Sequence, residues 1–200
     1  MKYNDLTIGQ IEAIGNKLGG MEGIQNFLSG KTVVVSAETL NAIPFSVWKS
    51  IPLGTHKDAD AYRKALKKGG YKIGDWGNDI LGKPAFTVAE KEETIDLVKV
   101  TVAELGFKNG ATYKEICDAA ASRGLKKCPN EVGPALRLAY TDQPAGEWLR
   151  IAMDPIAGSD GDLYIFDVVH DCDGRWLYGD YGHPGSRWGA DYTFVFRLRK

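Results

Sequence analysis

The period of the hydrophobic pattern changes to two near residue 147, and this change most constrains the fold. Beyond Glu147, four segments rich in aromatic and β-branched residues have the composition of strands. Asp160-Gly161 and Asp173-Gly174 lie between successive segments, and Asp-Gly favours a hairpin because type I′ turns need positive φ. The sequence therefore predicts an antiparallel β-meander over residues 148–153, 163–169, 175–178 and 192–198.

Composition and charge shift at the same place. Formal charges of +2, +1 and -4 fall on residues 1–90, 91–140 and 141–200, and Gln143-Pro144-Ala145-Gly146 has the sequence of a turn. The last third also holds a concentration of aromatic residues: Trp148, Tyr164, Phe166, Trp176, Tyr178, Tyr181, Trp188, Tyr192, Phe194 and Phe196. A change of architecture is expected here.

The first ninety residues predict a mostly helical region. Thr7 and Gln10 have capping-box spacing before a helix that Gly19-Gly20 ends. Asp58 or Thr55 is the expected cap of a helix that runs through Lys68. Two further short helices, over residues 24–28 and 73–81, and a strand over residues 32–35 complete this region.

The middle of the chain predicts three helices. Ile95, Val98, Val102 and Leu105 share one helical face, Thr112 and Glu115 form a second capping box, and residues 131–140 form the third helix. Followed by the expected hairpin, residues 94–170 resemble a winged helix. The predicted fold is therefore α+β, with a helical N-terminal region (1–90) and a winged-helix-like middle that continues into the antiparallel sheet (91–200).

The resemblance to winged helices implies a nucleic-acid surface. In that family the third helix enters the major groove and the hairpin contacts the backbone. The basic helix near residue 64 would extend this surface, although the expected hairpin is acidic, which opposes phosphate binding. Packing or protein contact is the alternative use of the same unit. The candidate nucleic-acid-binding residues are Lys64, Lys67, Lys68, Lys126, Lys127, Arg137 and Arg150, with Asn130 beside them.

Residues 60–200 also resemble a family of uncharacterised bacterial proteins. The resemblance depends on four runs, which are Lys83–Phe86, Glu131–Leu138, Gly146–Met153 and Phe194–Arg197. It implies no activity, because that family has none assigned.

A second hypothesis is a ligand-recognition domain that uses the aromatic C-terminal sheet. The loop after the third strand carries Tyr181, His183, Arg187 and Trp188 beside Asp180. Exposed aromatic and charged side chains in one loop suit a sugar, a nucleotide or a peptide.

A third hypothesis is a small hydrolase or metal enzyme using His170 or His183. His170 and Cys172 share one strand face and Asp171 and Asp173 the other, so these four ligands cannot converge without a bulge. The pairing of Ser186 with His183 lacks a nucleophile motif. We therefore predict no catalytic residue, no metal and no cofactor.

The net charge of -1 and a sequence pI near 6.3 exclude a broadly basic protein. Three cysteines match no zinc spacing and fit a reducing compartment, and no signal peptide or membrane span is apparent. The expectation is a cytoplasmic, non-enzymatic DNA- or protein-binding module without a membrane partner.

Overall fold

The computed structural model describes residues 7–30 and 45–198, and the chain divides into two compact units, Met1–Pro44 and Phe45–Lys200. Residues 45–90, predicted to belong with the N-terminal region, thus share a unit with 91–200. The predicted strand over residues 32–35 lies outside the described residues.

In the described part of the N-terminal unit, residues 7–30, the chain forms two helices, α1 (Ile8–Lys17) and α2 (Gly20–Leu28). The predicted capping box is present at α1. The Thr7 hydroxyl accepts a hydrogen bond from Gln10 N, and Gln10 Oε1 accepts one from Thr7 N. Gly15 packs against Ile24 where the helices meet. This part of the sequence interpretation is confirmed.

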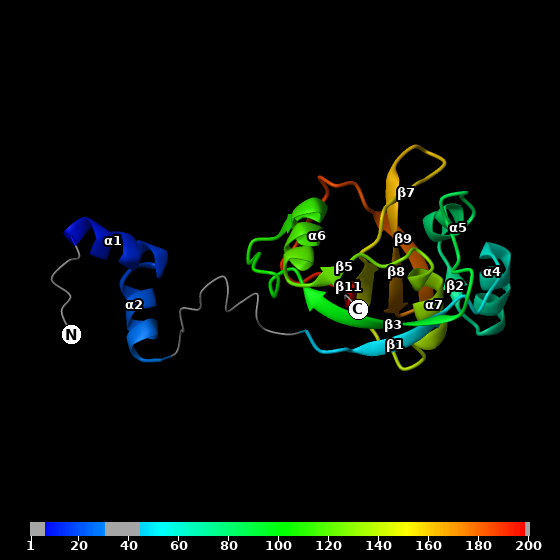
Figure 1. The fold of residues 1–200 in the computed structure, drawn as a ribbon, viewed down its shortest axis with the longest axis horizontal. Helices are drawn as coiled ribbons and strands as arrows, with labels where there is room; N and C mark the ends of the chain where they lie inside the picture. The colour runs from blue at the N-terminus through cyan, green and yellow to red at the C-terminus, as the bar shows by residue number, and fades with distance from the viewer. Residues whose placement is uncertain (1–6, 31–44, 199–200) are drawn as a thin grey trace. The chain divides into compact units, whose positions relative to one another are not determined.

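The larger unit is built on one curled sheet of nine strands (Figure 1). Its elements, in chain order, are β1 (Lys49–Leu53), α4 (Ala59–Lys68), β2 (Lys72–Ile73), α5 (Asp75–Leu81), β3 (Glu93–Thr101), β4 (Ala111–Thr112), α6 (Tyr113–Ser122), β5 (Leu125–Lys126), α7 (Val132–Ala139), β6 (Trp148–Ile151), β7 (Ile156–Ala157), β8 (Leu163–Asp171), β9 (Gly174–Tyr181), β10 (Arg187–Trp188) and β11 (Thr193–Leu198). The main strand order is β1-β3-β11-β6-β8-β9-β2, and β4 and β10 form a separate pair.

The predicted fold class is wrong, because the protein is a mixed α/β structure dominated by this sheet. All four predicted C-terminal strands exist, and β6, β8 and β9 form an antiparallel run. The fourth, β11, does not extend this run but pairs parallel to β6 and antiparallel to β3. Strands β1 and β2, which lie within the first ninety residues, join the same sheet, so these residues are not a separate helical region.

The first expected helix of the winged-helix unit is strand β3. Its sequence carries Ile95, Val98 and Val100, and β-branched residues fit a pleated strand better than a helix. Residues 95, 98 and 102 have the spacing of a helix only by coincidence. Because the strand is covered on both faces, it buries residues at odd and at even positions. Without that helix, residues 94–169 follow another topology and the winged-helix assignment is wrong.

The Asp173-Gly174 signal does mark the β8–β9 hairpin, but the turn differs from the expected type. Asp171 pairs with Gly174, whose φ is 125°. No described residue other than glycine has a positive φ, so Asp173 does not occupy a type I′ position.

Helix α7, the expected recognition helix, is buried. It packs on β1, β8 and β9, and every residue from Val132 to Arg137 is buried. The close approach requires Gly133, because a Cβ there would lie 2.6 Å from Phe166. The Arg137 side chain is fully buried and donates to Gln143 Oε1 (2.5 Å), Tyr140 O (2.5 Å) and Val169 O (3.0 Å).

Glu131, at the start of α7, ties three segments together. Its buried carboxylate accepts hydrogen bonds from Gly54 N (2.8 Å), Ala89 N (2.8 Å) and the Tyr62 hydroxyl (2.6 Å). The loops after β1 and before β3 are thereby held to α4 and α7. Buried charge with complete hydrogen bonding is the arrangement that avoids the desolvation penalty.

Gly133→Ala is expected to lower the free energy of unfolding by about 1–3 kcal/mol, because the added methyl group overlaps Phe166 in a packed core. Gly9→Ala in α1 is the control, since a Cβ there meets nothing within 4 Å. Thermal unfolding of both variants measures the effect. A Gly133→Ala protein as stable as the control would contradict the packing of α7 on β8.

Across residues 7–30 and 45–198, the structure has no helix both long and apolar enough to cross a bilayer.

Candidate functional site

Strand register places a charged pair on the sheet face opposite α7. Arg150, Asp167 and Tyr178 lie side by side on β6, β8 and β9. Because side chains alternate, these residues point away from Phe166, which faces α7. Phe194 of β11 shares their face, and there it contacts Tyr113 at the start of α6. We refer to this side as the α6 face.

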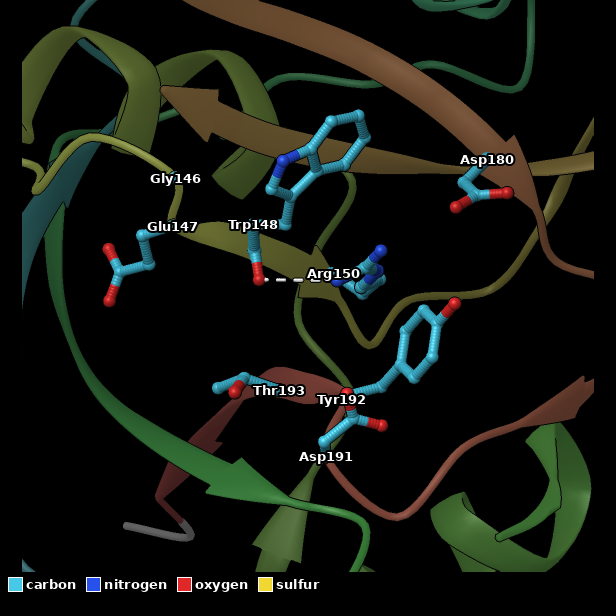
Figure 2. Close-up of a pocket in the computed structure, with 8 residues that line it drawn as sticks. All are labelled: Gly146, Glu147, Trp148, Arg150, Asp180, Asp191, Tyr192 and Thr193. Carbon is cyan, nitrogen blue, oxygen red and sulfur yellow. Dashed lines mark hydrogen bonds between the residues drawn. The ribbon is translucent and has the colours of Figure 1, made fainter. Parts of the chain in front are cut away.

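A trough of about 680 Å³ opens on the α6 face over β6, β8 and β9, beside the part that α6 covers. Figure 2 shows its lining: Gly146, Glu147, Trp148, Arg150, Asp180, Asp191, Tyr192 and Thr193. Its residues come from β6 and the turn before it, from β9, and from the first residue of β11 and the two residues before it. The non-local position of β11 beside β6 is what brings Tyr192 and Asp191 to this place.

Arg150 lies at the centre of the trough among aromatic rings. Its guanidinium carbon is 4.4 Å from the ring centroid of Tyr192 and 5.6 Å from those of Trp148 and Trp188. The Trp148 and Tyr192 rings lie on either side of it (Figure 2). Arg150 is buried, with only 9% of its surface exposed. Among the described residues it nevertheless makes a single hydrogen bond, from Nη1 to Trp148 O at 3.3 Å. Cation–π contacts with these rings hold the guanidinium in place.

Asp167 lies beneath this layer and is fully buried. Its Oδ2 is 3.4 Å from Arg150 Nε, and among the described residues neither carboxylate oxygen has a hydrogen-bond donor. Burial raises the pKa of the Asp167 carboxyl well above its usual range, and the Asp180 charge raises it further, whereas Arg150 opposes the shift. A buried carboxyl with a raised pKa, paired with one cation beside a cavity, makes this pair a candidate functional site.

The cover over Asp167 is aromatic. Trp148 stacks on Tyr178 at 5.9 Å, and Tyr178 stacks on Trp176 at 4.8 Å. This row of rings crosses from β6 to β9 above β8. Trp148 is nevertheless 40% exposed, so it presents free ring surface to the trough.

The trough is acidic at its rim. Asp180 and Asp191 line it without an ion pair to any described residue, while Glu147 points away from Arg150 and pairs with Lys99 at 2.8 Å. Apart from Arg150, the lining holds no cation. The site therefore repels anions at its edge and offers a guanidinium within.

The predicted ligand-binding residues lie next to this trough. Tyr181, Arg187 and Trp188 line a second cavity of about 340 Å³, which shares Asp180 and Tyr192 with the trough. His183 is exposed, and its Nδ1 accepts from Gly185 N instead of lining this cavity. Three of the four predicted residues are thus brought together beside the trough.

The predicted nucleic-acid-binding residues do not form one surface. Lys64, Lys67 and Lys68 are exposed on α4, and Lys126 and Lys127 are exposed near β5, where Lys127 pairs with Asp154. Arg137 is buried on the α7 side of the sheet, and Arg150 lies on the α6 face. The winged-helix fold on which the nucleic-acid prediction depended is therefore absent from residues 94–170, and its candidate residues lie on different faces.

The enzyme hypothesis gains little from the positions of its histidines. His170 Nδ1 contacts Gln143 O at 2.6 Å, and neither His170 nor His183 lines the trough or the cavity beside it. In the part of the chain that the structure describes, no three His, Cys, Asp or Glu residues are grouped to hold a metal ion. Cys117, Cys128 and Cys172 are free thiols.

The sequence pattern places Trp148 at the start of a predicted strand and Asp167 in the acidic hairpin, and it identifies neither residue as part of a site. One signal was present, because a single aspartate interrupts the apolar run from Leu163 to Val169. Alternation also places Trp148 and Arg150 on one face of their strand. The sequence does not indicate that β11 pairs with β6, and this pairing brings Tyr192 next to Arg150.

Asp167 predicts a pH dependence of stability. Its pKa is higher in the folded than in the unfolded chain, so its stabilising contribution is complete in acid and is lost as pH rises through the folded value. Relative to Asp167→Asn, the wild type should therefore lose stability as pH rises from about 4. Urea unfolding of both proteins over a pH series measures the difference. Parallel profiles would contradict the buried carboxyl.

Comparisons with known proteins found no matching family model, no similar curated protein and no similar solved structure. The resemblance of residues 60–200 to uncharacterised bacterial proteins accordingly stays an expectation. What the fold and the site define is a curled-sheet α/β protein with an aromatic, acid-rimmed trough on the α6 face.

Proposed function

We propose that this chain is a non-enzymatic binding protein whose trough takes a small neutral polyhydroxylated ligand, such as a sugar. The observation that carries the proposal is Arg150, nine-tenths buried at the centre of the trough, between Trp148 and Tyr192 and facing an acidic rim.

Charge argues against an anionic ligand. A phosphate that approached Arg150 would pass the carboxylates of Asp180 and Asp191, which line the trough. Like charges at short range cost more in a partly buried site than in water. A nucleotide or nucleic-acid backbone is therefore disfavoured.

A cationic ligand meets the opposite obstacle. The rings of Tyr192, Trp148 and Trp188 surround the guanidinium of Arg150, so even the exposed ring surface of Trp148 lies close to a positive charge. An incoming cation would have to bind beside that like charge. The aromatic cage is thus occupied by the protein's own cation.

A neutral polyol avoids both costs. Adjacent hydroxyl groups can accept from the guanidinium and donate to the Asp180 carboxylate, because each hydroxyl is both donor and acceptor. The exposed ring of Trp148 offers an apolar surface to the C–H face of a sugar ring. The lining supplies a partner for each part of such a ligand.

Thermal-shift screening with neutral saccharides, nucleotides and polyamines tests this proposal. A saccharide should raise the melting temperature of the wild type, and Trp148→Ala should abolish the shift. Trp76→Ala is the matched control, because Trp76 is also 40% exposed but stacks on Tyr164, on the α7 side. A shift from nucleotides or polyamines alone, or one lost equally in both variants, would contradict the proposal.

We also propose a cytoplasmic location, which the free thiols of Cys117, Cys128 and Cys172 support. Cys172 is exposed. In intact cells it should react with a membrane-permeant maleimide and resist an impermeant one. Labelling by the impermeant reagent would place the protein elsewhere.

A further inference from the structure

The two N-terminal helices expose apolar faces that they do not cover for each other. Only Gly15 is buried among residues 7–30. Six large apolar side chains are between 42% and 77% exposed: Ile8, Ile11, Ile14, Met21, Phe27 and Leu28. An exposed apolar patch of this kind on a short helical unit marks an interaction surface.

The exposed residues lie along one side of each helix. In α1, Ile8, Ile11 and Ile14 share an arc with Leu18, and in α2 Met21 and Leu28 share one with Ile24. Gly15 and Ile24, where the helices touch, belong to these same arcs. The two apolar arcs therefore adjoin and form one surface, which we call the N-terminal apolar face.

A unit this small needs support from outside itself. Units below about 70 residues usually rely on a disulfide, a metal or association, because their hydrophobic core is small, and residues 1–44 form such a unit. Residues 1–44 contain no cysteine and no histidine, so the sequence provides neither a disulfide nor the usual nitrogen and sulfur ligands of a structural metal. Contact with an apolar surface outside residues 1–44 is the means of stabilisation that remains.

Charge selects the kind of partner. Residues 7–30 carry Glu12, Lys17 and Glu22 as their only charged side chains. A basic face that would draw the helices to an anionic membrane is missing from these residues. Near-neutral, mixed charge permits two identical faces to meet without repulsion, as an isologous two-fold interface requires.

We propose that the N-terminal apolar face binds the same face of a second copy, so that α1 and α2 of two chains form a four-helix dimer. Each chain contributes its six exposed apolar side chains to the new core. Two helices per chain, each with a single apolar arc, have the pattern of a bundle that is completed by its partner.

Sedimentation equilibrium of the full chain tests this proposal. The wild type should reach twice 21.9 kDa with rising concentration. Ile11→Asp/Ile14→Asp should remain monomeric. Ala13→Asp/Asn16→Asp is the matched control, because it adds the same charge on the exposed polar side of α1 and should still dimerise.

A milder variant covers the case in which the aspartates unfold α1. Ile11→Ala/Ile14→Ala keeps helix propensity high and should weaken dimerisation at least tenfold. A wild type that is monomeric at every concentration overturns the proposal. So does a dimer that both aspartate variants leave intact, or one that both abolish, and so does sedimentation of the wild type with anionic phospholipid vesicles in place of self-association.

Discussion

Arg137→Met is expected to lower the free energy of unfolding by about 3 kcal/mol, because three buried acceptors lose their donor at once. These are Gln143 Oε1, Tyr140 O and Val169 O. The variant no longer has to bury a charged guanidinium, which offsets part of the lost stability. The cost of that burial is seen in the Arg137 pKa, which burial lowers to about 10. In a chain of this size the melting temperature should fall by about 6–12 °C.

Lys64→Met is the control for this prediction, since Lys64 is exposed on α4 and should tolerate the same change within a degree or two. Arg137→Lys should also be destabilised, because an ammonium cannot span the positions that the planar guanidinium reaches. If Arg137→Met melts with the control, then α7 does not lie where the structure places it.

The second large effect concerns the trough. Arg150→Met combined with Asp167→Asn should weaken saccharide binding by about 10–100-fold, because hydrogen bonds from a charged donor contribute roughly 1.5–3 kcal/mol. The pair is replaced together so that no unpartnered carboxylate stays buried. Isothermal titration with the saccharide that gives the largest thermal shift measures the affinity.

Asp167→Asn alone separates this effect from a general loss of structure. It removes the buried acid but keeps Arg150 in the trough, so binding should stay within about threefold of the wild type. Equal binding by the double variant and the single variant would show that Arg150 does not contact the ligand, and would reject the proposed chemistry of the site.

Local signals in the sequence predicted local structure well. The capping boxes at Thr7 and Thr112 and the cap at Asp58 are all present, because such caps involve residues only three apart. The C-terminal strands were also predictable from local signals, because their composition and the turns between them are read from neighbouring residues. Strand β3 was not, because a strand buried on both faces loses the alternation that identifies strands.

Long-range pairing is what the sequence could not provide. Nothing local to Thr193–Leu198 indicates that β11 inserts between β3 and β6. The candidate site depends on this insertion, since it places Tyr192 against Arg150. The predicted ligand loop consequently lies beside the trough; Arg150, at the centre of the trough, is predicted from the sequence only as a nucleic-acid contact, and Asp167 beneath it is not predicted as a site residue.

NMR titration of the ¹⁵N-labelled full chain tests the trough most directly. A saccharide should shift the Arg150 Nε–H and Trp148 indole signals in a saturable manner and leave the Trp76 indole signal unchanged. Saturable shifts confined to other residues, or no shift with any neutral saccharide when a nucleotide or polyamine does move Arg150, would contradict this prediction.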